Sequence, residues 1–573
     1  MTPHFSSPVA PIRFVVYALL LAFATIIGRL AYLQIQTAYT LFRRGKQNYL
    51  RYEQVASPRG NIYDCTGKLL ATNKPIIQLV WQGTGHSTLT ATQRTTLAKV
   101  QQILSLPLNE SAITQVERRK TALILQNDLS FEQLSCIMEQ FPNDPNLTFK
   151  TDFIRYYPHG TVACHILGYL SAATTQLAGV MGLEKACDTL LRGVPGQVLH
   201  TINAFGSVLS QQEVYQARAG NSVQTTLNVD LHMIAEACFP EGYAGAVVIM
   251  EASTGALRVV LSQPMFDPNM FLTGVNAHTW QQLLDRKAFL NRVFSACYPP
   301  ASLFKLVTMV MALDTHLIEP DEVWFCPGYI LFCGRLYHCM NQTAHGHITV
   351  KQAIAKSCNI PFFELGKRIK INTLAQYAHW LCLGSTTNSI IGEKIGLIPT
   401  THWKQATMKE PWWPGETLSV AIGQGALQVT PLQICRAIGT ICQGYSVTPH
   451  LLQNTPVERT IPPINPAVFT IIKDAMKHVV TTGTGKKLAN LANMHVYAKT
   501  GTAQTRALSS VIEGDATSQA HGWFAAHVTY KDQPSFVIVI LIEHSGTSRI
   551  PTTVAKEFLT QYQQYIDLKE HTA

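Results

Sequence analysis

The sequence predicts an α+β protein that is attached to a membrane by one N-terminal helix. Three features indicate this: an uncharged apolar run near the N-terminus, two widely separated pairs of apolar runs, and helical stretches between these pairs. Both pairs have the pattern of a β-hairpin, two apolar runs about a turn. Hairpins at both ends of a helical region indicate one sheet that unites the beginning and the end of that region.

The membrane-spanning helix is predicted over residues 14–35. The uncharged run from Phe14 to Gly28 would cover roughly 22 Å as a helix, less than a hydrocarbon core of ~30 Å. The apolar pattern resumes after Arg29, whose side chain can reach towards the membrane surface. The alternative is a cleaved signal peptide, because Ala22-Phe23-Ala24 matches an A-x-A site. Cleavage there would leave the later apolar residues exposed at the start of the mature chain. An uncleaved anchor avoids this exposure and is therefore favoured.

The flanking residues set the expected orientation. Residues 1–13 carry Arg13 and no acidic side chain, so the positive-inside rule places them in the cytoplasm. We therefore expect a single-pass protein of the cell inner membrane with its C-terminal catalytic domain in the periplasm, which excludes ATP and nicotinamide chemistry. The net charge of +10 comes without a long Lys/Arg run or basic patches with interleaved aromatics, so nucleic acid is not an expected partner.

Two domains are expected after the anchor. Residues 36–220 are mixed in character, with a helical and polar stretch near 90–140. Residues 221–573 contain the two hairpins and the helices between them. The predicted strands are Gly245–Met250 with Ala256–Leu261 and Gly522–Val528 with Ser535–Ile542, and a helix is predicted from about Thr553 to Leu568.

The segment Tyr298–Lys305 (YPPASLFK) is the first candidate for chemistry. Its two prolines cannot continue a helix, whereas the residues from Ser302 onward can, so Ser302 is predicted at a helix N-terminus with Lys305 on the same face. A buried lysine can lose its proton and activate a serine, and the helix N-terminus offers N–H groups to an oxyanion. An N-cap serine beside a surface lysine is the alternative, since S-x-x-K alone arises by chance on the order of once or twice in such a chain.

Two later motifs change that balance. Ser357-Cys358-Asn359 lies in a helical context, and Lys499-Thr500-Gly501-Thr502 follows an apolar-flanked run. Gly501 lets a substrate backbone approach closely, while Lys499, Thr500 and Thr502 can bind a carboxylate. S-x-x-K, S-D-N and K-T-G form the motif set of β-lactamases and penicillin-binding proteins, and the three segments of this chain follow that order, with Ser357-Cys358-Asn359 in the place of S-D-N.

With these motifs the chain resembles a class B penicillin-binding protein, and the resemblance covers roughly residues 29–546. Similarity to penicillin-binding protein 2, the elongation subfamily, is strongest. The pedestal motifs and the subfamily motifs that carry it are Arg59–Gly67, Tyr157–Gly160, Gly179–Glu184, Ser262–Asn269, Leu284–Arg292, Gly392–Pro399 and Trp413–Gly425. No glycosyltransferase-like domain precedes the pedestal, which argues against the bifunctional class.

The resemblance implies a β-lactamase/transpeptidase-like domain, an antiparallel sheet with helices, after a pedestal of the dimerisation type. It implies a serine-type D,D-transpeptidase of the D-Ala-D-Ala carboxypeptidase class, acylated on Ser302 by stem peptides of the lipid-linked precursor. In this scheme β-lactams are covalent inhibitors and a SEDS-type glycosyltransferase and elongation-complex proteins are partners. The Ser302 and Thr502 N–H groups would form the oxyanion hole, and Ser357 would pass protons to the leaving amine. Alternatives are a non-catalytic β-lactam sensor, a division-specific transpeptidase and a secreted β-lactamase.

The chain departs from the family pattern at three places. Ala301 stands where glycine usually precedes the nucleophile, Tyr497-Ala498 replaces Ala-Gly before the lysine, and Cys187 takes a place often held by tyrosine. We expect the larger side chains at Ala301 and at Tyr497-Ala498 to narrow the space next to the substrate cleft slightly, without changing the acylation chemistry.

Four of the thirteen cysteines crowd into one stretch with three histidines. Three thiolates and one imidazole suit a closed, structural tetrahedral zinc site. The resemblance extends to a zinc-binding version of the subfamily and implies the ligands Cys326, Cys339, His345 and Cys358, leaving Cys333, His338 and His347 aside. A Cys326–Cys339 disulfide or unconnected buried cysteines are the alternatives.

Overall fold

The computed structural model describes residues 9–171, 178–203, 208–272, 274–387, 389–505 and 518–572. The chain forms two compact units. Unit 1 comprises residues 1–58, 74–154 and 193–220, and unit 2 comprises residues 59–73, 155–192 and 221–573. Each unit therefore contains segments that are far apart in the sequence.

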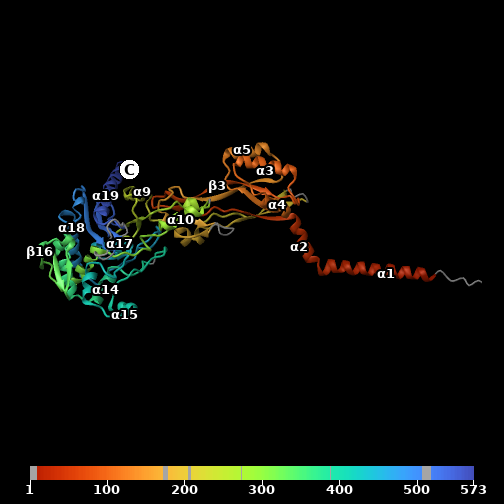
Figure 1. Cartoon of the computed structure of the whole chain (residues 1–573). Helices are drawn as coiled ribbons and strands as arrows, with labels where there is room; N and C mark the ends of the chain where they lie inside the picture. Colours follow the sequence, from red (N-terminus) through yellow and green to blue (C-terminus); the bar gives the residue numbers. More distant parts are fainter. Residues whose placement is uncertain are drawn as a thin grey trace, which may run out of the picture. The chain divides into compact units, whose positions relative to one another are not determined.

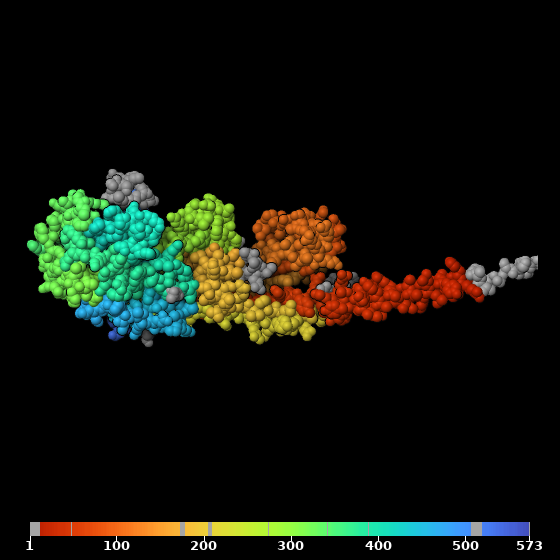
Figure 2. All heavy atoms as spheres, turned by 90° about the horizontal axis from the view of Figure 1, so that it is seen from below, coloured from red at the N-terminus to blue at the C-terminus, as the bar shows by residue number. Residues whose placement is uncertain are grey.

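Unit 1 begins with the predicted apolar helix. Helix α1 (Val9–Ala31) continues through a π-helical turn (Tyr32–Gln36), and the stretch Ile12–Gln36 is long and apolar enough to cross a membrane. Its apolar side chains are exposed; in Figure 2 the segment is the run of red spheres next to the grey N-terminal residues. Exposure of a continuous apolar surface is costly in water, so this segment fits the expected anchor.

The rest of unit 1 combines a three-stranded antiparallel sheet, of order β1-β8-β9, with three helices that pack around the later part of β3. Capping boxes at Thr90 and Ser130 start two of these helices by satisfying orphan backbone N–H groups. Its elements are α2 (Ala38–Tyr49), β1 (Leu50–Val55), β3 (Leu69–Gln82), α3 (Ala91–Leu104), α4 (Glu110–Arg119), β4 (Ala122–Gln126), α5 (Phe131–Gln140), β5 (Leu147–Tyr156), β8 (Gly196–Ile202) and β9 (Val208–Tyr215).

Unit 2 is built on a five-stranded antiparallel sheet of order β12-β11-β21-β20-β19 (Figure 1). The central pairing of β11 with β21 joins the two predicted hairpins, so the predicted α+β fold class is confirmed. The strands are β11 (Gly245–Glu251), β12 (Leu257–Gln263), β19 (Met494–Ala503), β20 (His521–Tyr530) and β21 (Phe536–Ile542).

Helices cover both faces of this sheet. Strands β11 and β21 are buried at every position, as expected of strands covered on both sides. Neighbouring residues of β21 point to opposite faces: Phe536 packs edge to face against Tyr562 of α19 (Arg549–Thr572), while Val537 lies against Gly439 of α17 (Pro431–Gln443). The helix predicted from Thr553 to Leu568 corresponds to α19, which extends beyond the predicted range at both ends.

The remaining elements of unit 2 surround the sheet. The helices are α6 (Cys164–Leu167), α7 (Gly182–Ala186), α8 (Asp188–Leu191), α9 (Val229–Cys238), α10 (Ala277–Asp285), α11 (Lys305–Asp314), α12 (Val350–Ala355), α13 (Ile360–Arg368), α14 (Ile371–Trp380), α15 (Thr401–Met408), α16 (Pro414–Ala421) and α18 (Pro466–Thr481). The short strands are β2 (Ile62–Tyr63), β6 (Leu170–Ser171), β7 (Ala178–Gly179), β10 (Val223–Gln224), β13 (Val323–Cys326), β14 (Tyr329–Phe332), β15 (Arg335–His338), β16 (Gly346–Thr349), β17 (Ser446–Val447) and β18 (Arg459–Thr460).

A buried ion cluster ties the first segments of unit 2 together. The fully buried Glu184 carboxylate accepts hydrogen bonds from Arg59 Nε at 2.6 Å and from Arg155 Nε at 2.7 Å. The hydroxyl of Tyr157 donates to the same carboxylate at 3.3 Å, and burial raises the pKa of this tyrosine. One buried anion thus compensates two arginines from segments that the sequence places about a hundred residues apart.

Replacing that anion should destabilise unit 2 strongly. We expect Glu184→Ala to cost about 3–5 kcal/mol, because the buried Arg155 would lose its counter-charge, whereas Arg59 would keep Asp188 at 2.8 Å. The thermal unfolding midpoint of the full chain measures this, with Glu364→Ala as control, since Glu364 forms an exposed pair with Lys367 worth at most about 1 kcal/mol. Equal midpoints for the two variants would contradict the role given to Glu184.

Candidate active site

The predicted nucleophile lies on a short turn before a buried helix. Residues Ala301–Leu303 form a 3₁₀ turn, and the α-helix α11 begins only at Lys305, three residues later than the sequence analysis placed it. Two contacts from other elements hold this turn: Trp523 Nε1 donates to the Pro299 carbonyl at 3.0 Å, and the Ala301 N–H donates to the Gly423 carbonyl at 2.9 Å. Ser302 is partly exposed, whereas Lys305 is fully buried.

The Ala301 departure has a backbone consequence. Ala301 is buried and left-handed, with φ +50°. A Cβ on Gly423 would lie 1.9 Å from the Ala301 carbonyl oxygen, so glycine is required there to admit the turn. On the other side a Cβ on Gly501 would meet Ala301 Cβ at 3.5 Å, an ordinary contact. The methyl group of Ala301, which glycine would lack, therefore fits against the strand that carries the K-T-G motif. Its cost is the left-handed backbone conformation of Ala301.

Lys305 connects the first motif to the second. Its Nζ donates to the Ser357 carbonyl at 2.8 Å, to Asn359 Oδ1 at 2.7 Å and to Ser357 Oγ at 3.4 Å. Among the described residues, these and the Cys358 carbonyl are its hydrogen-bond partners, and Ser302 Oγ is not one of them. Burial lowers the pKa of Lys305 to about 8, in the direction that the sequence analysis anticipated.

Lys499 approaches the same serine from the sheet. Its Nζ donates to Ser357 Oγ at 2.9 Å and to the Thr500 carbonyl at 3.1 Å. Lys499 is fully buried, and burial followed by the charge of Lys305 lowers its pKa well below the ordinary value. Ser357, left-handed with φ +53°, thus lies between two buried lysines. The structure brings all three predicted motifs together at this residue.

The K-T-G segment lies on the edge strand β19, and two further residues fix it. Thr484 Oγ1 lies 2.6 Å from Thr500 Oγ1, and Gln424 Nε2 donates to the Thr502 carbonyl at 3.5 Å. Thr484 belongs to none of the predicted motifs, although the preceding Gly483 signals a close approach. A Cβ at that position would lie 2.2 Å from the Ala355 carbonyl oxygen. The Thr500 hydroxyl is therefore held by a neighbouring turn.

An ion pair that the sequence did not indicate supports the turn before Ser302. Glu543, just after β21, accepts from Arg292 Nε at 2.9 Å and from the Tyr298 hydroxyl at 2.5 Å. The nearby Arg292 and the two hydrogen bonds lower the pKa of Glu543 against the opposing effect of burial, which is the largest single contribution. Tyr298, which precedes the predicted nucleophile Ser302 by four residues, is thereby bonded to the residue that follows β21.

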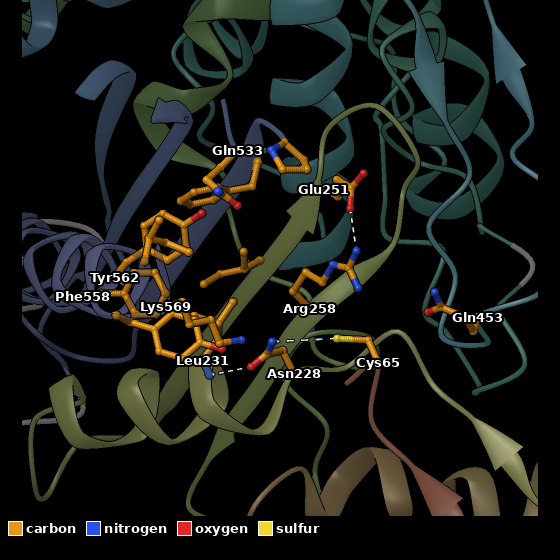
Figure 3. A pocket seen from close by; sticks show the side chains of 15 residues that line it. Cys65, Asn228, Leu231, Glu251, Arg258, Gln453, Gln533, Phe558, Tyr562 and Lys569 are labelled. Carbon is orange, nitrogen blue, oxygen red and sulfur yellow. Dashed lines mark hydrogen bonds and ion pairs between the residues drawn. The ribbon is translucent and has the colours of Figure 1, made fainter. Parts of the chain in front are cut away.

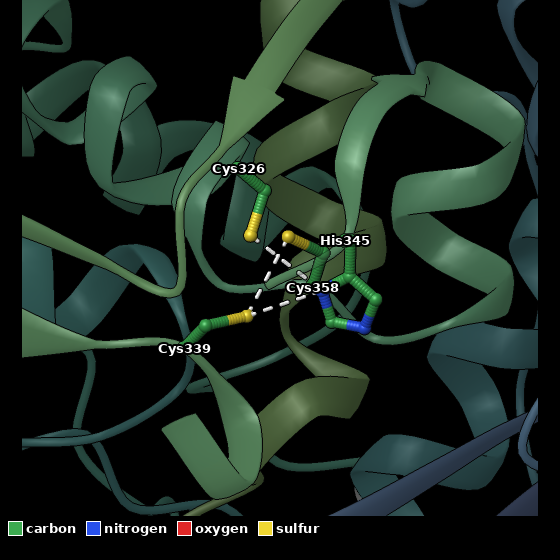
Figure 4. A group of neighbouring side chains, drawn as sticks. All are labelled: Cys326, Cys339, His345 and Cys358. Carbon is green, nitrogen blue, oxygen red and sulfur yellow. Dashed lines mark hydrogen bonds between the residues drawn. The ribbon is translucent and has the colours of Figure 1, made fainter. Parts of the chain in front are cut away.

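The cysteine-rich stretch forms a compact cluster beside the second motif (Figure 4). The Sγ atoms of Cys326, Cys339 and Cys358 and a ring nitrogen of His345 all lie within 4.8 Å of one another. His345 Nδ1 is 3.6 Å from Cys326 and 3.5 Å from Cys339, and the sulfurs of Cys339 and Cys358 are 3.6 Å apart. The structure thus groups the four predicted ligands, and no other histidine, cysteine, aspartate or glutamate among the described residues belongs to this group.

The other candidates of this stretch lie apart from the cluster. Cys333 is exposed at the turn between β14 and β15, and His347 is exposed on β16. The carbonyl of His338 accepts from Asn359 Nδ2 at 3.0 Å, and Cys339 Sγ accepts from the Asn359 N–H at 3.4 Å. The cluster is therefore bonded directly to Asn359, a residue of the second motif.

The strain at Ala301 can be measured. Because a non-glycine residue in the left-handed region costs roughly 1–2 kcal/mol, we expect Ala301→Gly to raise the free energy of unfolding by about 0.5–1 kcal/mol, after the greater freedom of unfolded glycine is subtracted. Chemical denaturation of the full chain measures the change. Ala312→Gly in the interior of α11 is the control and should destabilise; a loss of stability in Ala301→Gly as well would disprove the strain.

Comparison with known proteins places this site in a family. Residues 245–560 match the penicillin binding protein transpeptidase domain, and residues 54–225 match the penicillin-binding protein dimerisation domain. The peptidoglycan D,D-transpeptidase MrdA of Haemophilus influenzae is 30% identical over 90% of this chain and 85% of its own length. MrdA of Escherichia coli K12 is 27% identical over 94% and 92%.

Solved structures agree with the sequence relatives. Penicillin-binding protein 2 of Helicobacter pylori, in its complex with MreC, has a TM-score of 0.78 at 25% identity and covers 90% of this chain and 99% of its own. A chain from a peptidoglycan synthase complex that coordinates polymerisation and crosslinking has a TM-score of 0.74 at 27% identity, covering 96% and 98%. This chain belongs to the penicillin-binding protein transpeptidase family, as a class B peptidoglycan D,D-transpeptidase of the penicillin-binding protein 2 kind that cross-links the cell wall during elongation.

Proposed function

We propose that Ser302 is the residue acylated during this cross-linking. The observation that carries the proposal is the meeting of all three motifs at Ser357, which the first motif reaches through Lys305, three residues after the partly exposed Ser302. Ser302 Oγ attacks the carbonyl carbon between the two D-alanines of a stem peptide, the peptide C–N bond breaks, and terminal D-alanine leaves. An acceptor amine then attacks the ester, forms the new peptide bond and returns Ser302 to its free form.

The buried lysines have different roles in this scheme. Lys305 as the neutral amine takes the Ser302 proton, and Ser357 passes a proton to the departing amine. Lys499, with Thr500 and Thr502, holds the substrate carboxylate, and Gly501 leaves room for the substrate backbone. Asn359 lines the opposite wall, and the N–H groups of Ser302 and Thr502 receive the developing oxyanion.

Mass spectrometry after incubation with a penicillin tests the nucleophile. We expect one covalent adduct per chain on the peptide that contains Ser302, and no adduct on Ser302→Ala. Circular dichroism should show that this variant keeps its fold, because Ser302 is partly exposed and the substitution removes only a hydroxyl group. An adduct on any other serine of the wild-type chain would refute the assignment.

A pair of lysine variants separates the base from the carboxylate site. We expect Lys305→Ala to slow acylation by several orders of magnitude at every ligand concentration, because the proton acceptor is gone. Lys499→Ala should chiefly weaken binding of the ligand carboxylate. Stopped-flow acylation by a fluorescent penicillin gives both the limiting rate and the half-saturating concentration. A near wild-type limiting rate for Lys305→Ala would remove lysine from the base role.

We propose that the cysteine cluster holds one structural zinc ion through Cys326, Cys339, His345 and Cys358. The donor set fits: three sulfurs and one imidazole converge within 4.8 Å, which is the chemistry of closed tetrahedral zinc sites. The hydrogen bond between Cys358 and Cys339 lowers the pKa of Cys339 and raises that of Cys358, so the two share a proton that a cation would displace. When bound, zinc would supply a positive charge that holds the four ligands in place. Because Cys358 lies between Ser357 and Asn359 in the sequence, fixing Cys358 also fixes these two residues.

Elemental analysis of the purified protein tests the metal. We expect about one zinc per chain, lost in Cys326→Ala and in Cys358→Ala and kept in Cys333→Ala, since Cys333 is exposed at a turn. Cys326→Ala leaves every residue of the three motifs in place, so slower acylation in this variant reports on the metal alone. Protein without metal that is acylated at the full rate would refute the zinc site.

We also propose that α1 anchors the chain in the cell inner membrane with unit 2 on the periplasmic side. Arg13, in the first part of α1 and just before the uncharged run that starts at Phe14, supports this orientation. The relatives solved in a complex with MreC and in a peptidoglycan synthase complex support elongation-complex proteins as partners. In this proposal a SEDS-type glycosyltransferase supplies the glycan polymerised from the lipid-linked precursor.

A further inference from the structure

A cavity in unit 2 lies apart from the catalytic residues, on the α19 face of the sheet (Figure 3). It has a volume of about 350 Å³ and opens between α9, α19 and the β11–β12 hairpin. That volume is at the lower end of the range for sites that bind small molecules. None of the residues of the three motifs or of the cysteine cluster lines it.

One side of the cavity is apolar. Leu231 of α9, Ile249 of β11 and Phe558, Tyr562 and Ile566 of α19 supply this wall. Phe558 and Tyr562 lie one helical turn apart and their rings are stacked, with centroids 6.3 Å apart. Such a wall offers flat aromatic and branched aliphatic surface to the apolar body of a ligand.

The other side of the cavity is polar and centres on Arg258. This guanidinium donates to Glu251 Oε2 at 2.7 Å and to the Thr226 carbonyl at 3.2 Å, and it also lies close to the Cys65 thiol. Figure 3 shows Arg258 between Glu251 and the pair formed by Asn228 and Cys65, whose amide nitrogen and sulfur are 3.8 Å apart. The cavity thus has one apolar side and one hydrogen-bonding side.

The charges around the cavity favour an acceptor or an anion rather than a cation. Glu251 is already neutralised by Arg258, and Asp230, which lies behind Tyr565, is paired with Lys68. The ammonium group of Lys569 lies over the ring of Tyr565, 4.6 Å from its centroid, and adds positive charge at the lining. A cationic ligand would be repelled by Arg258 and Lys569, and the two carboxylates described here, Glu251 and Asp230, are already paired with other cations.

We propose that this cavity is a binding site for a small amphipathic molecule with an apolar ring or branched body and one carboxylate- or sulfonate-type head group. The body lies on the wall formed by Leu231, Phe558, Tyr562 and Ile566, and the head group accepts from Arg258. The site is separate from β-lactam acylation, so its occupant need not resemble a stem peptide. Cys65 lies beside the head group and serves as a built-in reporter of occupancy.

Affinity labelling of the full chain tests the proposal. The probe is 5-[2-(iodoacetamido)ethylamino]naphthalene-1-sulfonate, which carries an aromatic body, a sulfonate and a thiol-reactive arm. Its reaction joins the Cys65 sulfur to the probe carbon, releases iodide and gives the thiol proton to the buffer. Peptide mass spectrometry follows the rate at Cys65, with exposed Cys136 of unit 1 as internal reference and iodoacetamide as the probe without a body.

We expect the rate at Cys65 to saturate with probe concentration. Relative to Cys136, Cys65 should react about tenfold faster with the naphthalene probe than with iodoacetamide, equivalent to ~1.4 kcal/mol of binding. Non-reactive 8-anilinonaphthalene-1-sulfonate should slow Cys65 and leave Cys136 unchanged, and Ile566→Trp, which fills the apolar side, should remove the advantage. A rate at Cys65 that rises linearly with probe and is indifferent to the competitor would overturn the proposal, whatever the folding of the variant.

Discussion

The burial of two lysines on either side of Ser357 is the constraint on which the rest of this site depends. A single ammonium group taken out of water loses several kcal/mol of solvation, and a second one nearby adds repulsion. Unit 2 accepts this because Lys305 and Lys499 find oxygen acceptors on the same short segment. The cost is then spread over three elements, the helix α11, the segment 357–359 and the strand β19, so none of them can move without exposing an unsatisfied charge.

The surrounding polar contacts are consistent with that constraint. The turn that carries Ser302 is attached to the sheet through Trp523 and through the chain from Tyr298 to Glu543 and Arg292. Asn359 is attached to the cysteine cluster through its backbone N–H, which donates to Cys339, and its side-chain amide donates to the carbonyl of the neighbouring His338. Both attachments use groups that do not react themselves. They hold the turn before Ser302 and the segment 357–359 in the positions at which Lys305 and Lys499 can reach their hydrogen-bond acceptors.

The sequence indicated what is local and missed what depends on distant partners. The hairpins and the three motifs were predictable, because alternation and short spacing are properties of a few neighbouring residues. The prediction that one sheet unites the two hairpins was confirmed by the pairing of β11 with β21. The contacts of Glu543 with Tyr298 and of Thr484 with Thr500 were not predictable, since nothing in either segment specifies the other. The late start of α11 at Lys305 also follows from such a contact, the bond of Ala301 to Gly423.

The backbone at the site is strained at two points that flank the chemistry. Ala301 and Ser357 are both left-handed without being glycine, a state that costs about 1–2 kcal/mol for each residue. Such strain persists only where the surroundings determine the conformation more strongly than the residue does. At Ala301 that determinant is the close approach of Gly423, and at Ser357 it is the convergence of two lysines on one hydroxyl and one carbonyl. The residue that the family usually has at position 301 would avoid the first cost, whereas no glycine could replace Ser357, because its side chain is the point at which the three motifs meet.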